Sequence, residues 1–263
     1  MEDNSDGELF GAVIGNDDRF PVPNPTVEPQ RFICRIEAVT SIEGSQYKYD
    51  MGTGFLILPN VIVTAAHNVW QPGSNYIQYN VGAAAYKPSD LSKMKQFKFD
   101  PRIVRIHPEF LKAKNKKDME SANFRNWDIA VITLPRNLAF SELRGNMFSY
   151  GEIVGGVPDS RMAVIGYPKK TPLKMTGSYG RVTGRGKEVG TNKPNNLLLH
   201  DIDAEVGQSG GPILPVRSDG VYGNACYGIH IAEAADKKVN IGLAFSKPIM
   251  TFIEQNSVIP DID

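Results

Sequence analysis

The sequence predicts an all-β protein made of two strand-rich halves, followed by one short helix at the C-terminus. Two observations support this fold class. Short runs of β-branched and aromatic residues, bounded by Gly, Pro and Asn, recur along the chain, and patterns with a helical period are scarce. A chain of 263 residues can bury a large core without metals or disulfides. We therefore expect about six strands in each half.

The first predicted strand covers residues 31–38, where apolar and polar residues alternate. Phe32, Cys34 and Ile36 lie on one face and Arg35 and Glu37 on the other, as in a strand that covers a core. A Pro-Asn turn at 59–60 separates the next two strands. The further strands are predicted over residues 54–58, 61–64, 103–107, 129–134, 162–167, 178–183, 197–201, 212–215, 225–231 and 241–245.

Composition divides the chain into segments. Residues 31–135 form the first half and residues 161–245 the second, and the Gly- and Pro-rich segment 136–160 connects them. Residues 1–30 are acidic and contain several prolines, so we expect an irregular arm. Ser246 can cap a helix over residues 247–256, with Pro248 in its first turn. The apolar face of this helix should dock on the core.

Charge and hydropathy exclude two classes of function. The 29 basic and 29 acidic residues cancel, so the chain lacks the long-range positive field of nucleic-acid binders. Basic runs at 93–98 and 112–117 have acidic neighbours and are interpreted as solvated loops. No apolar run approaches the ~20 residues of a membrane helix. We expect neither nucleic acid nor membrane as a partner.

The compartment and the cysteines leave alternatives open. The N-terminus is acidic and polar, so either the protein is cytosolic or a secretion signal has been removed, and we favour secretion. Cys34 and Cys226 lie far apart and match no metal or redox motif. We expect buried thiols, although an oxidising compartment would allow a disulfide between them.

Three short segments contain the residues of a nucleophilic hydrolase. They are TAAH ending at His67, WDIAV around Asp128, and GQSGGP around Ser209. Each alone is more often structural: a packed histidine, a turn aspartate and a glycine-rich turn. Together they supply a nucleophile, a base that takes its proton, and an acid that orients the base. The order His, Asp, Ser is a known arrangement of this triad on a double β-barrel.

The glycine before the serine predicts an oxyanion site. Gly207 lets the backbone turn so that its N–H, together with that of Ser209, points at the oxyanion of the tetrahedral intermediate. The segment also fits the G-x-S-x-G motif of α/β-hydrolases, in which the acid and then the histidine follow the serine. Too few residues follow Ser209 for those later strands and helices, so this alternative is excluded.

The motifs resemble those of the trypsin/chymotrypsin superfamily, and their details are similar to its glutamyl endopeptidase branch. The resemblance begins at residues 13–19 (VIGNDDR), which are similar to the mature start of those enzymes, and extends through the three motifs to YGIH at His230. Gln208 stands where trypsin-like zymogens have an aspartate that captures the new N-terminus. Asn68 stands where trypsin-like enzymes have a disulfide cysteine. Both differences fit the glutamyl branch.

The resemblance also implies a substrate pocket. In the glutamyl branch, the substrate carboxylate is bound by a histidine after the nucleophile and by a hydroxyl residue before it. His230 matches the histidine, but Ala204 stands at the second position and lacks the hydroxyl. Asp203 stands where trypsin has the aspartate that recognises Lys or Arg, so a basic preference stays open. The freed α-amino group of Val13 would help to bind the carboxylate, and residues 1–12 would be a propeptide remnant.

The resemblance thus implies a serine endopeptidase with two six-stranded antiparallel β-barrels of the chymotrypsin type, with residues 31–263 as the protease domain. It implies no cofactor and no metal. We expect a monomer that cleaves proteins or peptides, preferably after Glu or Asp. The alternative from another class is a protease-fold module that binds peptides without cutting them, and the complete triad argues against it. His107 and His200 match no family position and are interpreted as core residues.

Overall fold

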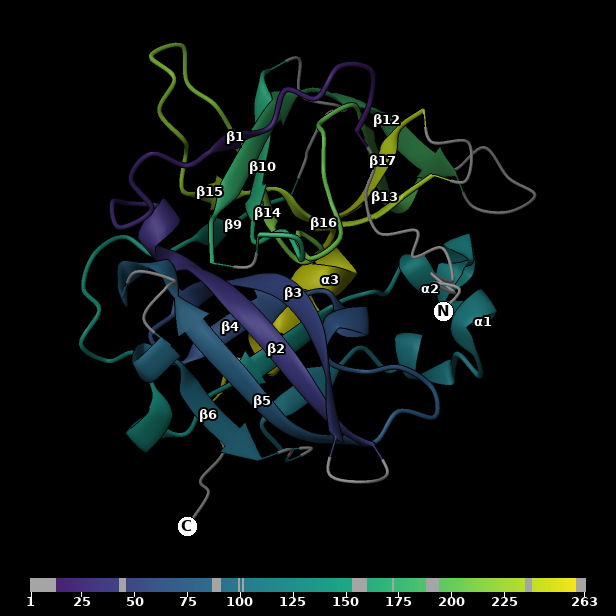
Figure 1. Ribbon diagram of the computed structural model, residues 1–263. Helices are drawn as coiled ribbons and strands as arrows, with labels where there is room; N and C mark the ends of the chain where they lie inside the picture. Colours follow the sequence, from purple (N-terminus) through teal and green to yellow (C-terminus); the bar gives the residue numbers. More distant parts are fainter. Residues whose placement is uncertain are drawn as a thin grey trace, which may run out of the picture.

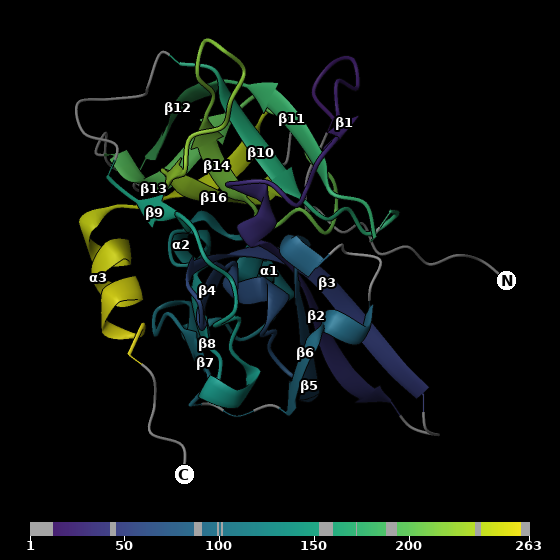
Figure 2. The same ribbon diagram turned by 90° about the vertical axis from the view of Figure 1, so that its left-hand side faces the viewer.

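The structure is a computed structural model that describes residues 13–42, 46–86, 91–98, 100, 102–152, 160–171, 173–187, 194–234 and 238–258. Its strands form two large antiparallel sheets, and each sheet curls into a barrel (Figure 1). The helix α3 (Lys247–Gln255) follows the last strand and lies at one side of the molecule (Figure 2). The predicted all-β class with a C-terminal helix is confirmed.

The first barrel is a seven-stranded sheet in the order β6-β5-β2-β3-β4-β8-β7. Among its strands, β2 and β3 form a long hairpin that is paired from Ile33↔Phe55 to Ile42↔Gln46. β5 and β6 were not predicted from the sequence, because polar residues interrupt their apolar pattern. The strands are β2 (Ile33–Ile42), β3 (Gln46–Leu58), β4 (Val61–Thr64), β5 (Tyr76–Ala83), β6 (Lys95–Lys98), β7 (Val104–Ile106) and β8 (Ala130–Thr133).

The second barrel is an eight-stranded sheet in the order β1-β11-β10-β14-β16-β17-β13-β12. Its first strand belongs to the arm that was expected to be irregular, and pairs with β11 at Gly177 and Thr176. The predicted strand over 178–183 spans the break between β11 and β12. The strands are β1 (Phe20–Pro21), β10 (Met162–Gly166), β11 (Thr176–Gly180), β12 (Val182–Lys187), β13 (Pro194–His200), β14 (Pro212–Pro215), β16 (Gly228–Glu233) and β17 (Asn240–Ala244).

Short elements complete the fold. A parallel pair, β9 (Ser149–Tyr150) with β15 (Ala225–Cys226), lies outside both sheets. Two short helices, α1 (Lys116–Glu120) and α2 (Ala122–Arg125), precede β8, and α1 begins within the basic run 112–117 that was interpreted as a solvated loop. Asn115 caps α1, because its side chain accepts a hydrogen bond from the N–H of Asp118. None of the described helices is long and apolar enough to cross a membrane.

The α3 helix forms as the sequence indicates. Ser246 occupies the N-cap position, although its side chain makes no capping hydrogen bond, and Pro248 stands in the first turn. Ile249, Phe252 and Ile253 are buried against the core. Burial of this face removes apolar area from water, which stabilises the docked helix by roughly 1.5–3 kcal/mol for each large side chain.

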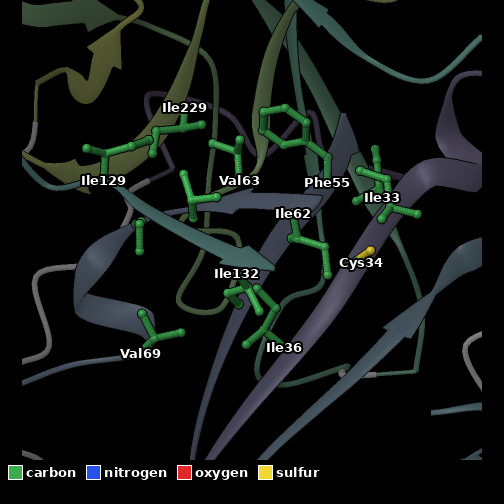
Figure 3. Close-up of a cluster of buried hydrophobic side chains, with 14 of the residues drawn as sticks. Ile33, Cys34, Ile36, Phe55, Ile62, Val63, Val69, Ile129, Ile132 and Ile229 are labelled. Atoms are coloured by element: carbon green, nitrogen blue, oxygen red, sulfur yellow. The ribbon is translucent and has the colours of Figure 1, made fainter. Parts of the chain in front are cut away.

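One large apolar cluster contains residues of both barrels, and a second, smaller cluster lies within the second barrel. Ile62 and Val63 of β4 and Ile129, which precedes β8, belong to the same cluster as Ile229 of β16 (Figure 3). This shared core fixes the position of one barrel against the other. Both cysteines are buried and free, so the disulfide alternative is not observed. Burial raises the pKa of the Cys226 thiol to about 12, which makes it an inert core residue.

Candidate active site

His67 and Asp128 meet because their strands are neighbours. His67 lies in a 3₁₀ turn (Ala66–Asn68) directly after β4, and Asp128 lies just before β8, which pairs with β4 in the register Thr64↔Ala130. One carboxylate oxygen, Oδ1, accepts the backbone N–H of His67 at 3.0 Å. The other, Oδ2, lies 2.6 Å from Nδ1 of the ring. Both residues are buried.

This contact assigns the tautomer of the imidazole. The carboxylate accepts a hydrogen bond from the N–H at Nδ1, so the neutral ring of His67 has its lone pair on Nε2. The low exposure of both side chains strengthens the attraction between Asp128 and a protonated ring. The pair is therefore suited to accept a proton at Nε2 and to stabilise the resulting cation.

Ser209 lies on a glycine-rich loop that joins β13 to β14 in the second barrel and faces the first barrel. Gly207 has φ +98°, and a Cβ there would lie 2.5 Å from the carbonyl oxygen of Tyr167. Gly210 has φ +83°, and its Cβ would lie 2.1 Å from the carbonyl oxygen of Thr53. Both positions therefore require glycine, for the backbone angle as well as for space.

The first barrel holds this loop through hydrogen bonds. The carbonyl of Ser209 accepts the N–H of Thr53 at 2.9 Å and the side-chain amide of Asn68 at 2.7 Å. Thr53 Oγ1 also donates to the carbonyl of Gly207 at 2.8 Å. A Cβ on Gly52 would lie 2.2 Å from Cγ of Asn68, so that glycine makes room for the amide. From the sequence, Asn68 was interpreted only as the residue that stands where trypsin-like enzymes have a cysteine, and Thr53 was not identified.

A small pocket of about 30 Å³ brings the predicted residues together. His67, Gly207 and Ser209 all line it. The N–H of Gln208 turns inwards to the carbonyl of Glu205 at 2.9 Å, whereas those of Gly207 and Ser209 make no backbone hydrogen bond to the described residues. Two amide groups at this pocket are thus available for an oxyanion. Ser209 Oγ lies 3.5 Å from the carbonyl oxygen of Ile231.

His230 is fully buried on β16, where its Nδ1 lies 3.4 Å from Nε2 of His200 on β13. The two rings meet edge to face, with centroids 5.4 Å apart. The pKa of His200 lies well below its ordinary value, mainly because the ring is buried and also because His230 lies next to it. The interpretation of His200 as a core residue thus missed its contact with His230. No local pattern marks this contact, which depends on how the strands are ordered.

Asp203 holds the N-terminal segment. Its Oδ1 accepts the N–H of Ile14 at 2.6 Å, and its Oδ2 accepts the N–H of Asp18 at 3.1 Å. Arg19 makes an ion pair with Glu205, two residues further along the same loop. Burial raises the pKa of Asp203, and the two backbone donors oppose that shift. Asp203 therefore anchors residues 14–19 to the second barrel.

Val13 and Ala204 line a second pocket of about 470 Å³ beside the nucleophile loop. Its other lining residues are mostly basic: Arg19, Lys169, Lys170, Glu205 and Val206. Lys169 and Val206 line both this pocket and the pocket of Ser209. The two cavities are therefore adjacent, and the second one has a net positive wall.

Comparison with known families decides the class. Residues 52–223 match the family model of the trypsin-like peptidase domain. The chain belongs to the trypsin-like peptidase family. The matched region contains the three motifs of His67, Asp128 and Ser209. A search of curated proteins finds no match for this peptidase.

Solved structures share the fold of the peptidase at low identity. A Glu endopeptidase in complex with MPD is 20% identical, with a TM-score of 0.68, over 94% of this chain and 99% of that one. The active form of the Rv3671c protease from M. tuberculosis is 18% identical, with a TM-score of 0.54, over 100% and 96%. Its inactive form is 18% identical, with a TM-score of 0.51, over 90% and 98%. These likenesses identify the chymotrypsin-like fold.

Proposed function

We propose that this peptidase is an endopeptidase in which Ser209 is the nucleophile, His67 the general base and Asp128 the residue that orients the base. The observation that supports it most is the contact between Nδ1 of His67 and Asp128 beside the pocket that Ser209 shares with His67. The sequence motifs suggest no other serine, histidine and aspartate for these three roles.

The chemistry follows from these positions. Ser209 Oγ attacks the carbonyl carbon of the scissile bond as Nε2 of His67 takes its proton, and Asp128 stabilises the imidazolium. The N–H groups of Gly207 and Ser209 stabilise the oxyanion, and each such donor contributes roughly 10²–10³ in rate. His67 then protonates the leaving nitrogen, which gives an acyl-enzyme and a free amine. Water hydrolyses the acyl-enzyme through the same base.

We further propose that cleavage follows Glu or Asp. Two features support this preference. Both carboxylate oxygens of Asp203 already accept backbone N–H groups, which weighs against an open partner for Lys or Arg. Arg19, Lys169 and Lys170 outnumber Glu205 in the pocket that Ala204 lines, which favours an acidic side chain there. His230, next to His200, would donate a hydrogen bond to the bound carboxylate.

Two experiments test this proposal: a fluorophosphonate probe tests the nucleophile, and a peptide library tests the preference for Glu or Asp. Labelling by a fluorophosphonate probe that disappears in Ser209→Ala is the expected result for the nucleophile. Sequencing of the products should then place Glu, and less often Asp, before the cut bonds. Cuts only after Lys or Arg would overturn the acidic preference and leave the nucleophile in place. A probe that fails to label the folded wild-type protein would contradict the hydrolase itself.

A further inference from the structure

Asn68 directly follows the proposed general base, and its side chain reaches the proposed nucleophile. His67 and Asn68 lie in the same 3₁₀ turn (Ala66–Asn68), which follows β4 of the first barrel. Nδ2 of Asn68 donates a hydrogen bond to the carbonyl oxygen of Ser209 at 2.7 Å. Asn68 is 4% exposed and lines the pocket that His67 and Ser209 share. One buried side chain therefore connects the turn of the base with the residue that carries the nucleophile.

The peptide group between Ser209 and Gly210 is held from both barrels. Its carbonyl, on Ser209, accepts Nδ2 of Asn68 and the backbone N–H of Thr53, which both belong to the first barrel. Its N–H, on Gly210, donates to the carbonyl of His230 on β16 of the second barrel at 2.7 Å. Because a peptide group is planar, these bonds at its two ends fix its orientation. The direction in which Oγ of Ser209 points depends on that orientation.

The amide of Asn68 fits its surroundings in one orientation. Its NH₂ group faces three acceptors, which are the carbonyl oxygens of Ser209 and Thr53 and Oγ1 of Thr64. Oγ1 of Thr64 acts as an acceptor because its own proton goes to the carbonyl of Thr53 at 2.7 Å. Both amide protons of Asn68 are therefore used. An oxygen atom in place of Nδ2 would face two carbonyl oxygens.

Gly52 on β3 provides the space for this amide. A Cβ at residue 52 would lie 2.2 Å from Cγ and 2.4 Å from Nδ2 of Asn68, far inside van der Waals contact. The φ angle of Gly52 is not in the left-handed region, so the backbone itself does not require glycine there. A side chain at residue 52 would push the amide away from Ser209 and leave every residue of the proposed triad in place.

We propose that Asn68 is a positioning residue for the attack of Ser209, and that Gly52 is required because it leaves room for the amide. This rests on the proposed endopeptidase function. The amide acts through the carbonyl of Ser209: it holds Oγ within reach of Nε2 of His67 and keeps the N–H of Ser209 directed at the oxyanion. A misplacement of about 1 Å can cost roughly a hundredfold in rate. The amide should therefore influence kcat more than KM.

The first test removes the amide. We expect Asn68→Ala to lower kcat for a peptide substrate roughly ten- to a hundredfold and to leave KM within about twofold. The rate of labelling by a fluorophosphonate probe should fall by a similar factor, because the probe reacts with the same Oγ. Full activity of Asn68→Ala, in a wild-type background that hydrolyses the peptide, would overturn the proposal.

Asn195→Ala is the matched control. Asn195 on β13 is also buried, and its Nδ2 also donates to a backbone carbonyl, that of Lys187 at 3.0 Å. This variant should lose thermal stability and keep the kcat of the wild type. An equal loss of kcat in Asn195→Ala and Asn68→Ala would show that any buried amide has this effect, and would overturn the specific role of Asn68.

Variants of Gly52 separate the hydrogen bond from packing. Gly52→Ala keeps Asn68 but displaces its amide, so this variant should lower kcat about as much as Asn68→Ala. In the double variant Gly52→Ala/Asn68→Ala, the new methyl group occupies part of the space that the amide leaves. Thermal stability should recover towards that of the wild type, whereas kcat should not. A double variant with wild-type kcat would show that only packing matters, and would overturn the proposal.

Asn68→Asp gives a readout that a purely structural role would not move. A carboxylate at residue 68 would face the carbonyl oxygens of Ser209 and Thr53, so burial and these oxygens should raise its pKa. Once protonated, this group can again donate to the carbonyl of Ser209. The ratio of variant kcat to wild-type kcat should therefore rise as the pH falls from about 8 to about 5.5. A constant ratio would contradict the role of the donor.

Other titratable groups lie near residue 68 in both proteins, so the comparison uses the ratio of the two rates. These groups are Asp50, His67, Asp128 and Lys169. Circular dichroism at each pH confirms that the variant is folded. A wild-type protein that hydrolyses no peptide would refute the endopeptidase function and this role with it, whereas an active wild type with an equally active Asn68→Ala refutes this role alone.

Discussion

His67 in the first barrel and His230 in the second are both buried histidines whose Nδ1 faces a titratable partner, but the partners differ in charge. His67 faces the carboxylate of Asp128 at 2.6 Å, and His230 faces the imidazole of His200 at 3.4 Å. A carboxylate stabilises an imidazolium, whereas burial keeps His200 neutral. The first pair is thus suited to move a proton, whereas the second places two fully buried imidazoles side by side, in direct contact rather than across a carboxylate.

The largest effect should come from the residues that act with the carboxylate-paired histidine. We expect Ser209→Ala and His67→Ala each to lower kcat by about 10⁶, with the double variant little worse, because the groups act as a unit. Steady-state hydrolysis of a peptide substrate measures this loss, with circular dichroism as the control for folding. Losses that add in the double variant would show that the two residues do not belong to one site.

Asp128→Asn removes the charge of the partner and keeps its shape. The amide still reaches His67 but favours the wrong tautomer of the ring, so we expect a loss of about 10⁴ in kcat. The fold should persist, because the amide can still accept the N–H of His67. Kinetics and thermal unfolding of the same sample separate the two effects. Near wild-type activity would mean that the carboxylate is only structural.

His230→Ala tests the second pair. A buried substrate carboxylate that loses its donor costs about 1–3 kcal/mol, so kcat/KM for Glu substrates should fall roughly ten- to hundred-fold. Substrates with an uncharged residue at this position should change little. Asp203→Ser serves as the comparison, because a basic pocket would make that variant lose cleavage after Lys or Arg. An equal loss on all substrates would assign His230 to the structure alone.

His200 should make stability depend on pH. Its pKa is depressed in the folded protein, so the unfolded chain binds more protons once the pH falls below its ordinary pKa of about 6.5. The free energy of unfolding should therefore decrease as the pH falls below 6.5. Chemical denaturation at pH 7.5 and 5.5 measures this change. His200→Leu should show a smaller decrease, and an identical decrease in both proteins contradicts the assignment.

The smallest effect concerns the N-terminal segment. A chain that begins at Val13 should cleave Glu substrates a few-fold faster than one that begins at Met1, because its free α-amino group adds a positive charge to the pocket that Val13 lines. Uncharged substrates provide the control. Equal rates for the two chains would mean that residues 1–12 are an inert extension.

Local sequence predicted much of the fold and the three motif residues. Continuous apolar runs such as 61–64 and 162–166 coincide with β4 and β10, because buried strands need no polar face. The motif around Ser209 required glycines, and their positive φ angles agree with that requirement. The strands β5 and β6 were not predicted, because Gln, Asn and Lys interrupt the alternation of their apolar residues.

The supporting contacts could not be predicted, because they join residues far apart in the chain. Thr53 and Asn68 bind the carbonyl of Ser209 across the boundary between the barrels. Asp203 binds residues of the N-terminal segment, and His200 meets His230 through the order of β13, β17 and β16. In each case no pattern in the neighbouring sequence marks the side chain, because its partner is brought to it only by the tertiary fold.

The hydrogen bonds from Thr53 and Asn68 to the carbonyl of Ser209 have a consequence for synthesis of the chain. The first barrel emerges from the ribosome with His67 and Asp128 but without a nucleophile. The serine loop follows much later, and it gains its position only when the second barrel docks on the first. With the proposed triad, a half-made chain therefore lacks the group that would cut peptide bonds, and activity requires both barrels.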